Sequence, residues 1–359
     1  MPRARLTRKE KKPAPRRWRQ SIRLSLVIVC WVFTILMLVG SVAWIGSGVS
    51  WRVDLIANLT AQMMFATVAL LVVMTLLRHW IATALLVLTL IVQFAGLTGG
   101  RADRSSTTDD TLVRMLTYNV FNRSDDQSAF VGLLERTGVD VMTIIEPTPF
   151  IARHLHSDAG VLDQYPHSEP PRPWSAKPLI LSRWPLEPIR LRYQRTSEND
   201  PNPGMSPSIA IVHRPGGSFV LVAVHPASPR SRHNWENGNE SIRQLGVMIT
   251  EELAPMGLPI VIGGDFNSTP SGFRSRALVG TTNLKRAKPL LNFNGTWPDD
   301  LPWPARLAID DAFVTPDIRI ADWSVLPPVT GGDHSMVRID LLIPASSAPL
   351  DETPAPPQD

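Results

Sequence analysis

Long apolar runs occupy the first quarter of the chain, and short apolar runs separated by polar segments occupy the remainder. An apolar helix of about 20 residues spans the hydrocarbon core of a membrane. Three runs reach or approach that length, the third being at the lower limit. They predict an anchor of three transmembrane helices within residues 24–97. The runs are Leu24–Ile45, Leu55–Leu77 and Trp80–Leu97.

Beyond residue 110 the apolar runs are short and end at Gly, Pro, Asp or Asn, which is typical of buried strands. Helical spacing of apolar residues predicts helices over Gln127–Arg136, Asn239–Leu253 and Ser271–Leu278. Strands outnumber helices, which favours two packed sheets flanked by helices over a doubly wound sheet. The predicted strands are Leu112–Val120, Val139–Ile145, Pro178–Leu181, Ile209–His213, Phe219–His225, Ile260–Gly264, Ile309–Val314 and Val337–Ile343.

The polar segments between and beyond these runs divide the chain. Thr98–Asp110 is a linker rich in Gly, Ser and Thr without hydrophobic periodicity, and Pro344–Asp359 has the composition of a disordered tail. A globular domain over residues 111–343 follows. The single cysteine, Cys30, falls in an apolar run, so an intrachain disulfide is excluded.

Charge is concentrated at the N-terminus. Residues 1–23 hold ten Lys and Arg and one Glu, a charge of about +9; subtracted from the total of +4, this leaves about −5 for the rest. A basic flank holds its side of the first span in the cytoplasm. With Arg78-His79 as a cytoplasmic turn, three spans deliver the domain to the outer face of the cell membrane. If the third run does not cross, the domain is cytoplasmic instead.

Polar residues recur where the predicted strands end or begin. Any one of them alone is ordinarily a turn residue. Together they predict a polar cleft at one sheet edge. They are Asn119, Glu146, His225, Asp265 with Asn267, Asp310, and Asp333 with His334.

Hydrolysis of a phosphate ester needs neutralised charge, a positioned water and a proton for the leaving oxygen. Carboxylate oxygens suit Mg²⁺, or Mn²⁺, and zinc-type His/Cys spacing is absent from the sequence. We expect Glu146 as the primary metal ligand, with Asp333 or Asn119 beside it.

The remaining polar residues fit the proton transfers. Asp265 is expected to take a proton from the attacking water, while Asn267 and Asn119 offer amide donors to phosphoryl oxygens. His334, oriented by Asp310, would present an imidazolium to the developing charge.

This series resembles the endonuclease/exonuclease/phosphatase superfamily over residues 112–343, including KPLILSRWPL at 177–186. The resemblance implies a four-layered α/β sandwich, here preceded by three transmembrane helices. It also implies that His225 contacts the phosphate or the leaving group. The orienting acid of the family falls on Asp310, with Asp311 beside it as the alternative.

The anchor followed by this domain is similar to bacterial membrane proteins of the teicoplanin-resistance type. That resemblance implies hydrolysis of a polyprenyl or other envelope lipid phosphate outside the membrane. An extracytoplasmic nuclease is the first alternative, but residues 101–359 hold 24 Lys and Arg against 30 Asp and Glu, which disfavours nucleic acid despite the strip Lys285, Arg286 and Lys288. An inactive membrane-tethered interaction module is the second. The sequence indicates no protein partner.

Overall fold

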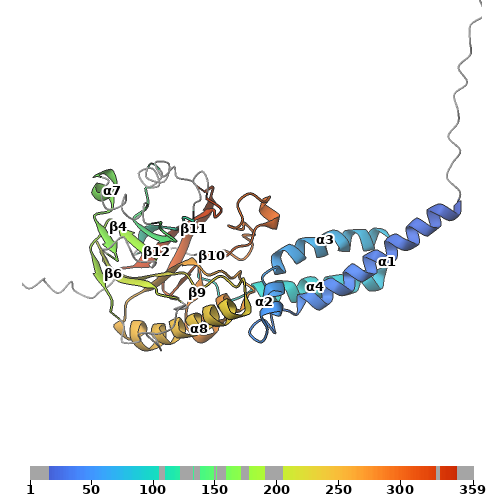
Figure 1. Ribbon diagram of the computed structural model, residues 1–359, viewed down its shortest axis with the longest axis horizontal. Helices are drawn as coiled ribbons and strands as arrows, with labels where there is room; N and C mark the ends of the chain where they lie inside the picture. The colour runs from blue at the N-terminus through green and yellow to red at the C-terminus, as the bar shows by residue number, and fades with distance from the viewer. Residues whose placement is uncertain are drawn as a thin grey trace, which may run out of the picture.

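The computed structural model describes residues 16–104, 110–121, 138–148, 159–170, 178–190, 205–328 and 332–345, together with residues 132 and 151. A bundle of apolar helices projects from one side of a larger α/β body (Figure 1). The helices of this N-terminal part are α1 (Arg16–Ser41), α2 (Trp51–Ala57), α3 (Thr60–Leu76) and α4 (Trp80–Leu97).

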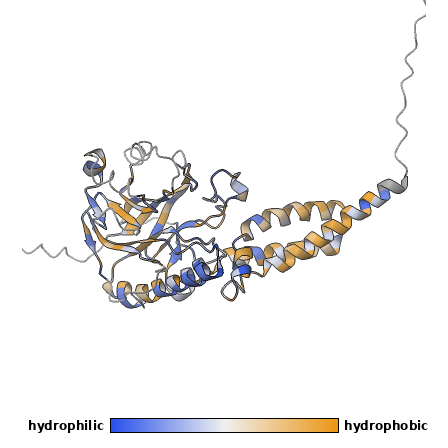
Figure 2. Ribbon diagram, in the orientation of Figure 1, coloured by the Kyte–Doolittle hydropathy of each residue, from blue (hydrophilic) through white to orange (hydrophobic). Residues whose placement is uncertain are grey.

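The surface of the bundle is apolar along its length, in contrast to the mixed surface of the α/β body (Figure 2). Large side chains such as Ile35, Val39 and Ile91 are more than half exposed, which suits lipid rather than water as the neighbouring medium. By length and composition, Gln20–Ser41 and Trp80–Leu97 can each cross a membrane.

The second apolar run differs from the single straight span that the sequence predicts. It forms two helices, α2 and α3, that meet at an angle of 56° and reach the length of a span only together. The polar residues near the break explain the bend, because they bond outside the helix. The Asn58 Oδ1 atom accepts the backbone N–H of Thr269 at 2.6 Å, and Gln62 Nε2 donates to the Arg306 carbonyl at 2.7 Å.

Two mixed sheets form the α/β body, each with six strands among the described residues. In the first sheet the neighbouring strands β1 and β2 are parallel and the other pairs are antiparallel. Its strands, in spatial order, are β11 (Arg319–Leu326), β12 (Met336–Pro344), β1 (Asp110–Asn119), β2 (Val141–Ile145), β4 (Leu179–Ser182) and β3 (His167–Glu169).

The second sheet repeats this plan. Strands β7 and β8 are parallel, and the other neighbours are antiparallel. Its strands, in spatial order, are β5 (Leu186–Pro188), β6 (Ser208–Arg214), β7 (Gly217–Val224), β8 (Ile260–Asp265), β10 (Asp310–Val314) and β9 (Lys285–Arg286).

A continuous apolar core lies between the two sheets, which therefore pack face to face. Val113 and Met115 of β1 pack in one buried cluster with Leu221 of β7 and Val261 of β8. The outer face of the second sheet is covered by helices through Ile242 and its neighbours. The outer face of the first sheet carries a separate cluster that includes Val161 of α7 (Ala159–Gln164). The predicted four-layered α/β sandwich is therefore confirmed.

The covering helices lie close to their predicted places. α8 (Arg232–Met248) starts earlier than predicted because Ser231 caps it, its hydroxyl accepting the N–H of Asn234 at 3.1 Å. A π-helical turn, Ile249–Leu253, continues it to the predicted end. The helix predicted over 127–136 lies outside the described residues except for residue 132, which is helical. The remaining helical elements are α7 (Ala159–Gln164), the 3₁₀ turns Ala254–Met256 and Trp303–Ala305, and α9 (Phe273–Thr281).

Four strands were not predicted, and each lacks a clear apolar pattern. β3 and β9 are only three and two residues long and polar, and β5 contains Pro188 at a sheet edge. In β11 the pairing shifts between Ile320 and Asp322, which interrupts the alternation expected of a strand.

The start of the predicted linker is packed against the second sheet. Arg101 pairs with Arg286 of the edge strand β9, and the Ala102 N–H donates to the Arg286 carbonyl at 3.0 Å. The guanidinium of Arg101 also donates to the carbonyls of Leu97 and Lys288. The end of α4 is thus joined directly to the α/β body.

Candidate active site

The sheet topology brings the polar strand ends to one edge of the sandwich. Parallel strands end on the same side of a sheet, and each sheet has one parallel pair at its centre. Asn119 ends β1 and Glu146 follows β2 in the first sheet. His225 follows β7 and Asp265 ends β8 in the second.

The antiparallel neighbours complete the set from the opposite direction. β10 runs against β8 and starts at Asp310, whose Cα pairs with that of Asp265. β12 runs against β1 and begins at Met336. Asp333 and His334 lie just before this start. An antiparallel strand begins where its neighbour ends, so these side chains reach the same edge.

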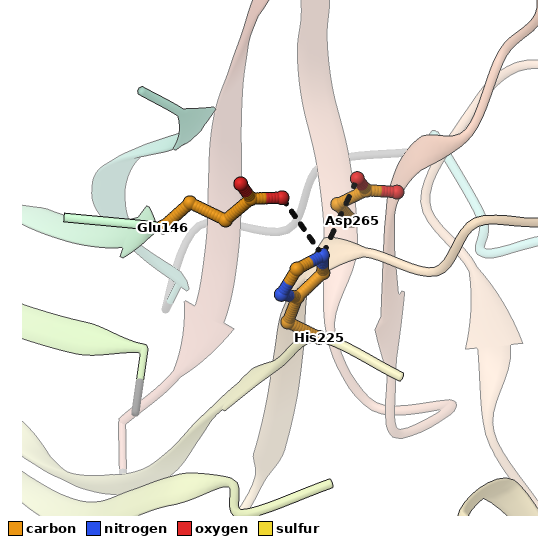
Figure 3. Close-up of side chains that lie close together, drawn as sticks. All are labelled: Glu146, His225 and Asp265. Carbon is orange, nitrogen blue, oxygen red and sulfur yellow. Dashed lines mark ion pairs between the residues drawn. The ribbon is translucent and has the colours of Figure 1, made fainter. Parts of the chain in front are cut away.

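Glu146, His225 and Asp265 form the first cluster of this site (Figure 3). One ligand atom from each lies within 4.8 Å of the others. The His225 Nε2 atom is 3.2 Å from Glu146 Oε1 and 3.8 Å from Asp265 Oδ2. The two sheets therefore contribute one carboxylate each to a single point.

Asn119 lies between the two carboxylates of this cluster. Its Nδ2 donates to Glu146 Oε1 at 3.2 Å and to Asp265 Oδ2 at 3.0 Å, and its Oδ1 accepts the N–H of Phe121 at 3.0 Å. The amide oxygen is thus engaged by the backbone. This arrangement favours Asn119 as a residue that positions the carboxylates.

Two residues of the site have a left-handed backbone, with φ of 53° at Glu146 and 49° at Asn267. Such a conformation costs a non-glycine residue on the order of 1–3 kcal/mol and is concentrated at functional sites. At Asn267 the backbone is held by its N–H, which donates to Asp265 Oδ1 at 2.7 Å, and by its Nδ2, which donates to the Pro226 carbonyl at 3.1 Å.

Asp265, Asp310 and His334 form a second, buried cluster that shares Asp265 with the first. His334 Nδ1 lies 2.9 Å from Asp310 Oδ2, and its Nε2 lies 3.9 Å from Asp265 Oδ2. Burial opposes a charge on His334, but the charge and hydrogen bond of Asp310 and the charges of Asp265 and Asp333 outweigh it and raise its pKa to about 10. The pair therefore holds an imidazolium against a carboxylate at neutral pH.

Asp311 takes no part in this cluster. It points to the other side of β10, where its Oδ2 lies 2.6 Å from Arg286 Nε and both side chains are buried. Alternation along a strand explains the division, because successive side chains face opposite sides of a sheet. Of the two adjacent acids, the structure places Asp310 in the site.

The basic strip that the sequence suggested for nucleic acid is not a surface strip. Arg286 and Lys288 are 1% and 3% exposed. Burial lowers the pKa of Lys288 to about 7, although the charge of Asp311 opposes the shift. These side chains stabilise the body beneath β10 and do not form a surface for phosphate groups.

The donor set of the first cluster fits a divalent cation. The carboxylate oxygens of Glu146 and Asp265 suit Mg²⁺ or Mn²⁺. Asp333 faces the same cavity, where the Trp297 indole N–H donates to its Oδ2 at 3.2 Å. Its buried Oδ1 accepts no hydrogen bond from the described residues, which leaves an acceptor for a cation or a water.

A cavity of about 650 Å³ is lined by Glu146, His225, Asp265 and His334 and extends to the helical bundle. Trp51, Leu55 and Leu59 of the α2–α3 region line it, as does Arg230 at its rim. These residues were missed from sequence, because an apolar run at the head of a span carries no sign of facing a site. The one available signal was Asp54, a carboxylate at the start of an apolar run.

Comparison with known proteins agrees with the geometry. The model of the Endonuclease/Exonuclease/phosphatase family matches residues 116–334, more than half of the chain. The protein belongs to this family. No curated protein matches the sequence.

Solved structures are similar to part of the chain at low sequence identity. D. rerio TDP2 complexed with single strand DNA product is 15% identical with a TM-score of 0.50, covering 65% of this chain and 99% of that chain. A mutant beta toxin from Staphylococcus aureus with bound magnesium ions is 16% identical with a TM-score of 0.47, covering 64% and 99%. Sphingomyelinase C from Streptomyces griseocarneus is 15% identical with a TM-score of 0.46, also covering 64% and 99%.

Proposed function

We propose that the protein is a divalent-metal-dependent phosphoesterase that acts at the outer face of the cell membrane on an envelope lipid phosphate, such as a polyprenyl phosphate. The observation that carries the proposal is the approach of Glu146, His225 and Asp265 within 4.8 Å, beside the buried pair of Asp310 and His334. The carboxylates can hold a metal ion and accept a proton, and the imidazolium of His334 supplies positive charge. Phosphoryl transfer to water requires groups of these kinds.

Glu146 is the principal residue for holding Mg²⁺ or Mn²⁺, with Asp333 as a second oxygen ligand. Asn119 positions Glu146 by its hydrogen bond of 3.2 Å. When bound, the ion would neutralise phosphoryl charge and polarise a phosphorus–oxygen bond. Metal ligands depend on such neighbours for their orientation.

Asp265 acts as the base for the attacking water. The Asn267 N–H at 2.7 Å and the Asn119 amide at 3.0 Å both donate to its carboxylate and fix its orientation. The proton of the water passes to Asp265, and the oxygen of the water bonds to phosphorus as the ester oxygen leaves.

The two histidines stabilise charge on the phosphoryl group and the leaving oxygen. With its Nδ1 engaged by Asp310, His334 offers the Nε2–H to a phosphoryl oxygen as a fixed charged donor. His225 lies between Glu146 and Asp265 and donates to the phosphate or to the leaving oxygen. A free amide hydrogen of Asn267 adds a neutral donor.

The arrangement of the anchor supports a location outside the cytoplasm. α1 begins at the end of the bundle farthest from the α/β body, and the turn between α3 and α4 lies at that same end (Figure 1). The basic N-terminal segment precedes α1 directly. Positive charge favours the cytoplasmic side, so the opposite end of the bundle, with the α/β body, lies outside.

A substrate panel tests the activity. The full-length protein, purified in detergent, is offered a polyprenyl pyrophosphate, plasmid DNA and a chromogenic phosphodiester, each with Mg²⁺ and with EDTA. We expect Mg²⁺-dependent turnover of the lipid. Cleavage of DNA alone would assign a nuclease, and no turnover of any substrate would assign an inactive module.

Protease accessibility tests the sidedness. In intact cells, an added protease is expected to cut the α/β body while leaving an epitope tag on the N-terminus intact. Protection of the α/β body until the membrane is permeabilised would place it in the cytoplasm.

A further inference from the structure

Helix α2 is bound to the α/β body by its polar face. Asp54, only 3% exposed, accepts the Phe273 N–H at Oδ1 and the Trp235 indole N–H at Oδ2, each at 2.8 Å. The Trp51 indole N–H donates to the Pro229 carbonyl at 2.9 Å. These contacts fix α2 next to the site rather than leaving it as a free part of a tether.

The C-terminal end of α2 is also hydrogen-bonded to the loop that follows β8. Asn58 Oδ1 accepts the Thr269 N–H at 2.6 Å, and the Ser271 hydroxyl donates to the Ala57 carbonyl at 2.7 Å. Thr269 is two residues beyond Asn267. The end of α2 is therefore held against the segment that carries the polar groups of the site.

The apolar face of α2 is turned into the active-site cavity. Trp51 and Leu55 are four residues apart in α2 and therefore share one side of that helix, and Leu59 lies at the break between α2 and α3. All three line the cavity that also contains Glu146 and Asp265. Leu55 and Leu59 remain 39% and 43% exposed, so their apolar surface is uncovered.

The cavity is thus lined by two chemically different sets of side chains. Carboxylates and histidines form one set, and Trp51, Leu55 and Leu59 together with Leu307 and Ile309 form the other. α2 lies where the helical bundle meets the α/β body (Figure 1). A ligand that contacts both sets carries a phosphate on a hydrocarbon chain, and the chain would pass from the membrane side.

We propose that Trp51, Leu55 and Leu59 form a subsite for the hydrocarbon chain of the substrate, so that the anchor itself determines specificity. This inference rests on the proposed function, since it names the part of the substrate that lies outside the phosphoryl site. α2 binds and orients the chain and takes no part in the chemical step.

Binding of alkylphosphonates to the full-length protein in lipid nanodiscs tests the subsite separately from hydrolysis. The probes are ethylphosphonate and octylphosphonate, which share a head group and differ in chain length. Each buried methylene favours binding about four-fold. We expect octylphosphonate to bind the wild type at least about 10-fold more tightly than ethylphosphonate.

The substitutions Leu55→Asn and Leu59→Asn are expected to lower this ratio of affinities by about 10-fold, the size of effect typical of a lost apolar contact in a pocket. Ile56→Asn is the matched control, because Ile56 is on the same helix, is 42% exposed, and lies towards Gly40 of α1. It is expected to keep the wild-type ratio.

The subsite is overturned if the wild type shows no chain-length preference, or if Ile56→Asn lowers the ratio as much as the two leucine variants do. A segment of protein as the true occupant would give the first of these results. Failure of the proposed function is a different outcome: alkylphosphonates bind with the expected preference, but no phosphate ester is hydrolysed with Mg²⁺.

Discussion

The Nδ1 atom of His334 lies 2.9 Å from Oδ2 of Asp310, and both side chains are buried. Burial raises the pKa of the Asp310 carboxyl, and the charge of His334 opposes that shift. The raised pKa of His334, about 10 against an ordinary 6.5, defines the pH range in which the imidazolium is present.

Replacing the carboxylate in Asp310→Asn is expected to move the alkaline limb of the activity profile to lower pH. In the wild type the charged form persists as pH rises to about 10. The stabilisation that the charged His334 gives the folded protein is present in full below pH 6.5, and it is lost as pH rises through about 10, the pKa of His334 in the folded protein. The profile of kcat against pH measures this, and an alkaline limb that stays in place in Asp310→Asn would contradict the assigned role.

The neighbouring acid is expected to affect stability instead of the pH profile. Asp311→Ala leaves the buried Arg286 without its partner at 2.6 Å. Removing one partner of a buried ion pair costs about 3–5 kcal/mol. Thermal unfolding in detergent should show a large fall in Tm for Asp311→Ala, and Asp317→Ala, at an exposed position, should show none. If Asp311→Ala and Asp317→Ala had equal Tm values, the Asp311–Arg286 pair would not stabilise the fold.

Removing the Asp54 carboxylate is expected to weaken the contact between α2 and the α/β body. Asp54→Ala removes the acceptor of the Phe273 N–H and of the Trp235 indole. An unsatisfied buried donor costs about 1–3 kcal/mol. Hydrogen exchange should therefore be faster at the Phe273 amide, while the amides of β12 keep their protection. Unchanged exchange at Phe273 would show that Asp54 does not hold the helix.

Asn119 is expected to act on metal affinity without binding the ion. Asn119→Ala removes the donor shared by Glu146 and Asp265, and losses of this kind lower metal affinity about 10–100-fold. Titration calorimetry with Mn²⁺ measures the change, with the exposed Asn294→Ala as control. An affinity equal to that of the wild type would assign Asn119 no part in the metal site.

The sequence was sufficient for the sandwich and for the residues at its polar edge. Buried strands such as β8 carry a continuous apolar run that ends in a polar residue, so Asp265 was visible as an exception at a strand end. The pairing of Asp310 with His334 was expected from the sequence, whereas Asp311 could be separated from Asp310 only by the orientation of β10.

The contribution of α2 could not be predicted, because it depends on contacts between distant parts of the chain. Asp54 bonds to Trp235 and Phe273, which are 181 and 219 residues away. Likewise, Arg286 and Lys288 read as a surface strip until Asp311 is placed beside them. Charge that is compensated within the core looks the same in a sequence as charge that faces water.

The most direct test of the central claim is the turnover of a chromogenic phosphodiester by the full-length wild type and by Asp265→Ala, each with Mg²⁺ and with EDTA. EDTA is expected to stop turnover by the wild type, and added Mg²⁺ is expected to restore it, whereas Asp265→Ala is expected to fold and to be slower by about 10²–10⁴-fold. Turnover that survives chelation, or a folded Asp265→Ala variant with the wild-type rate, would contradict the claim.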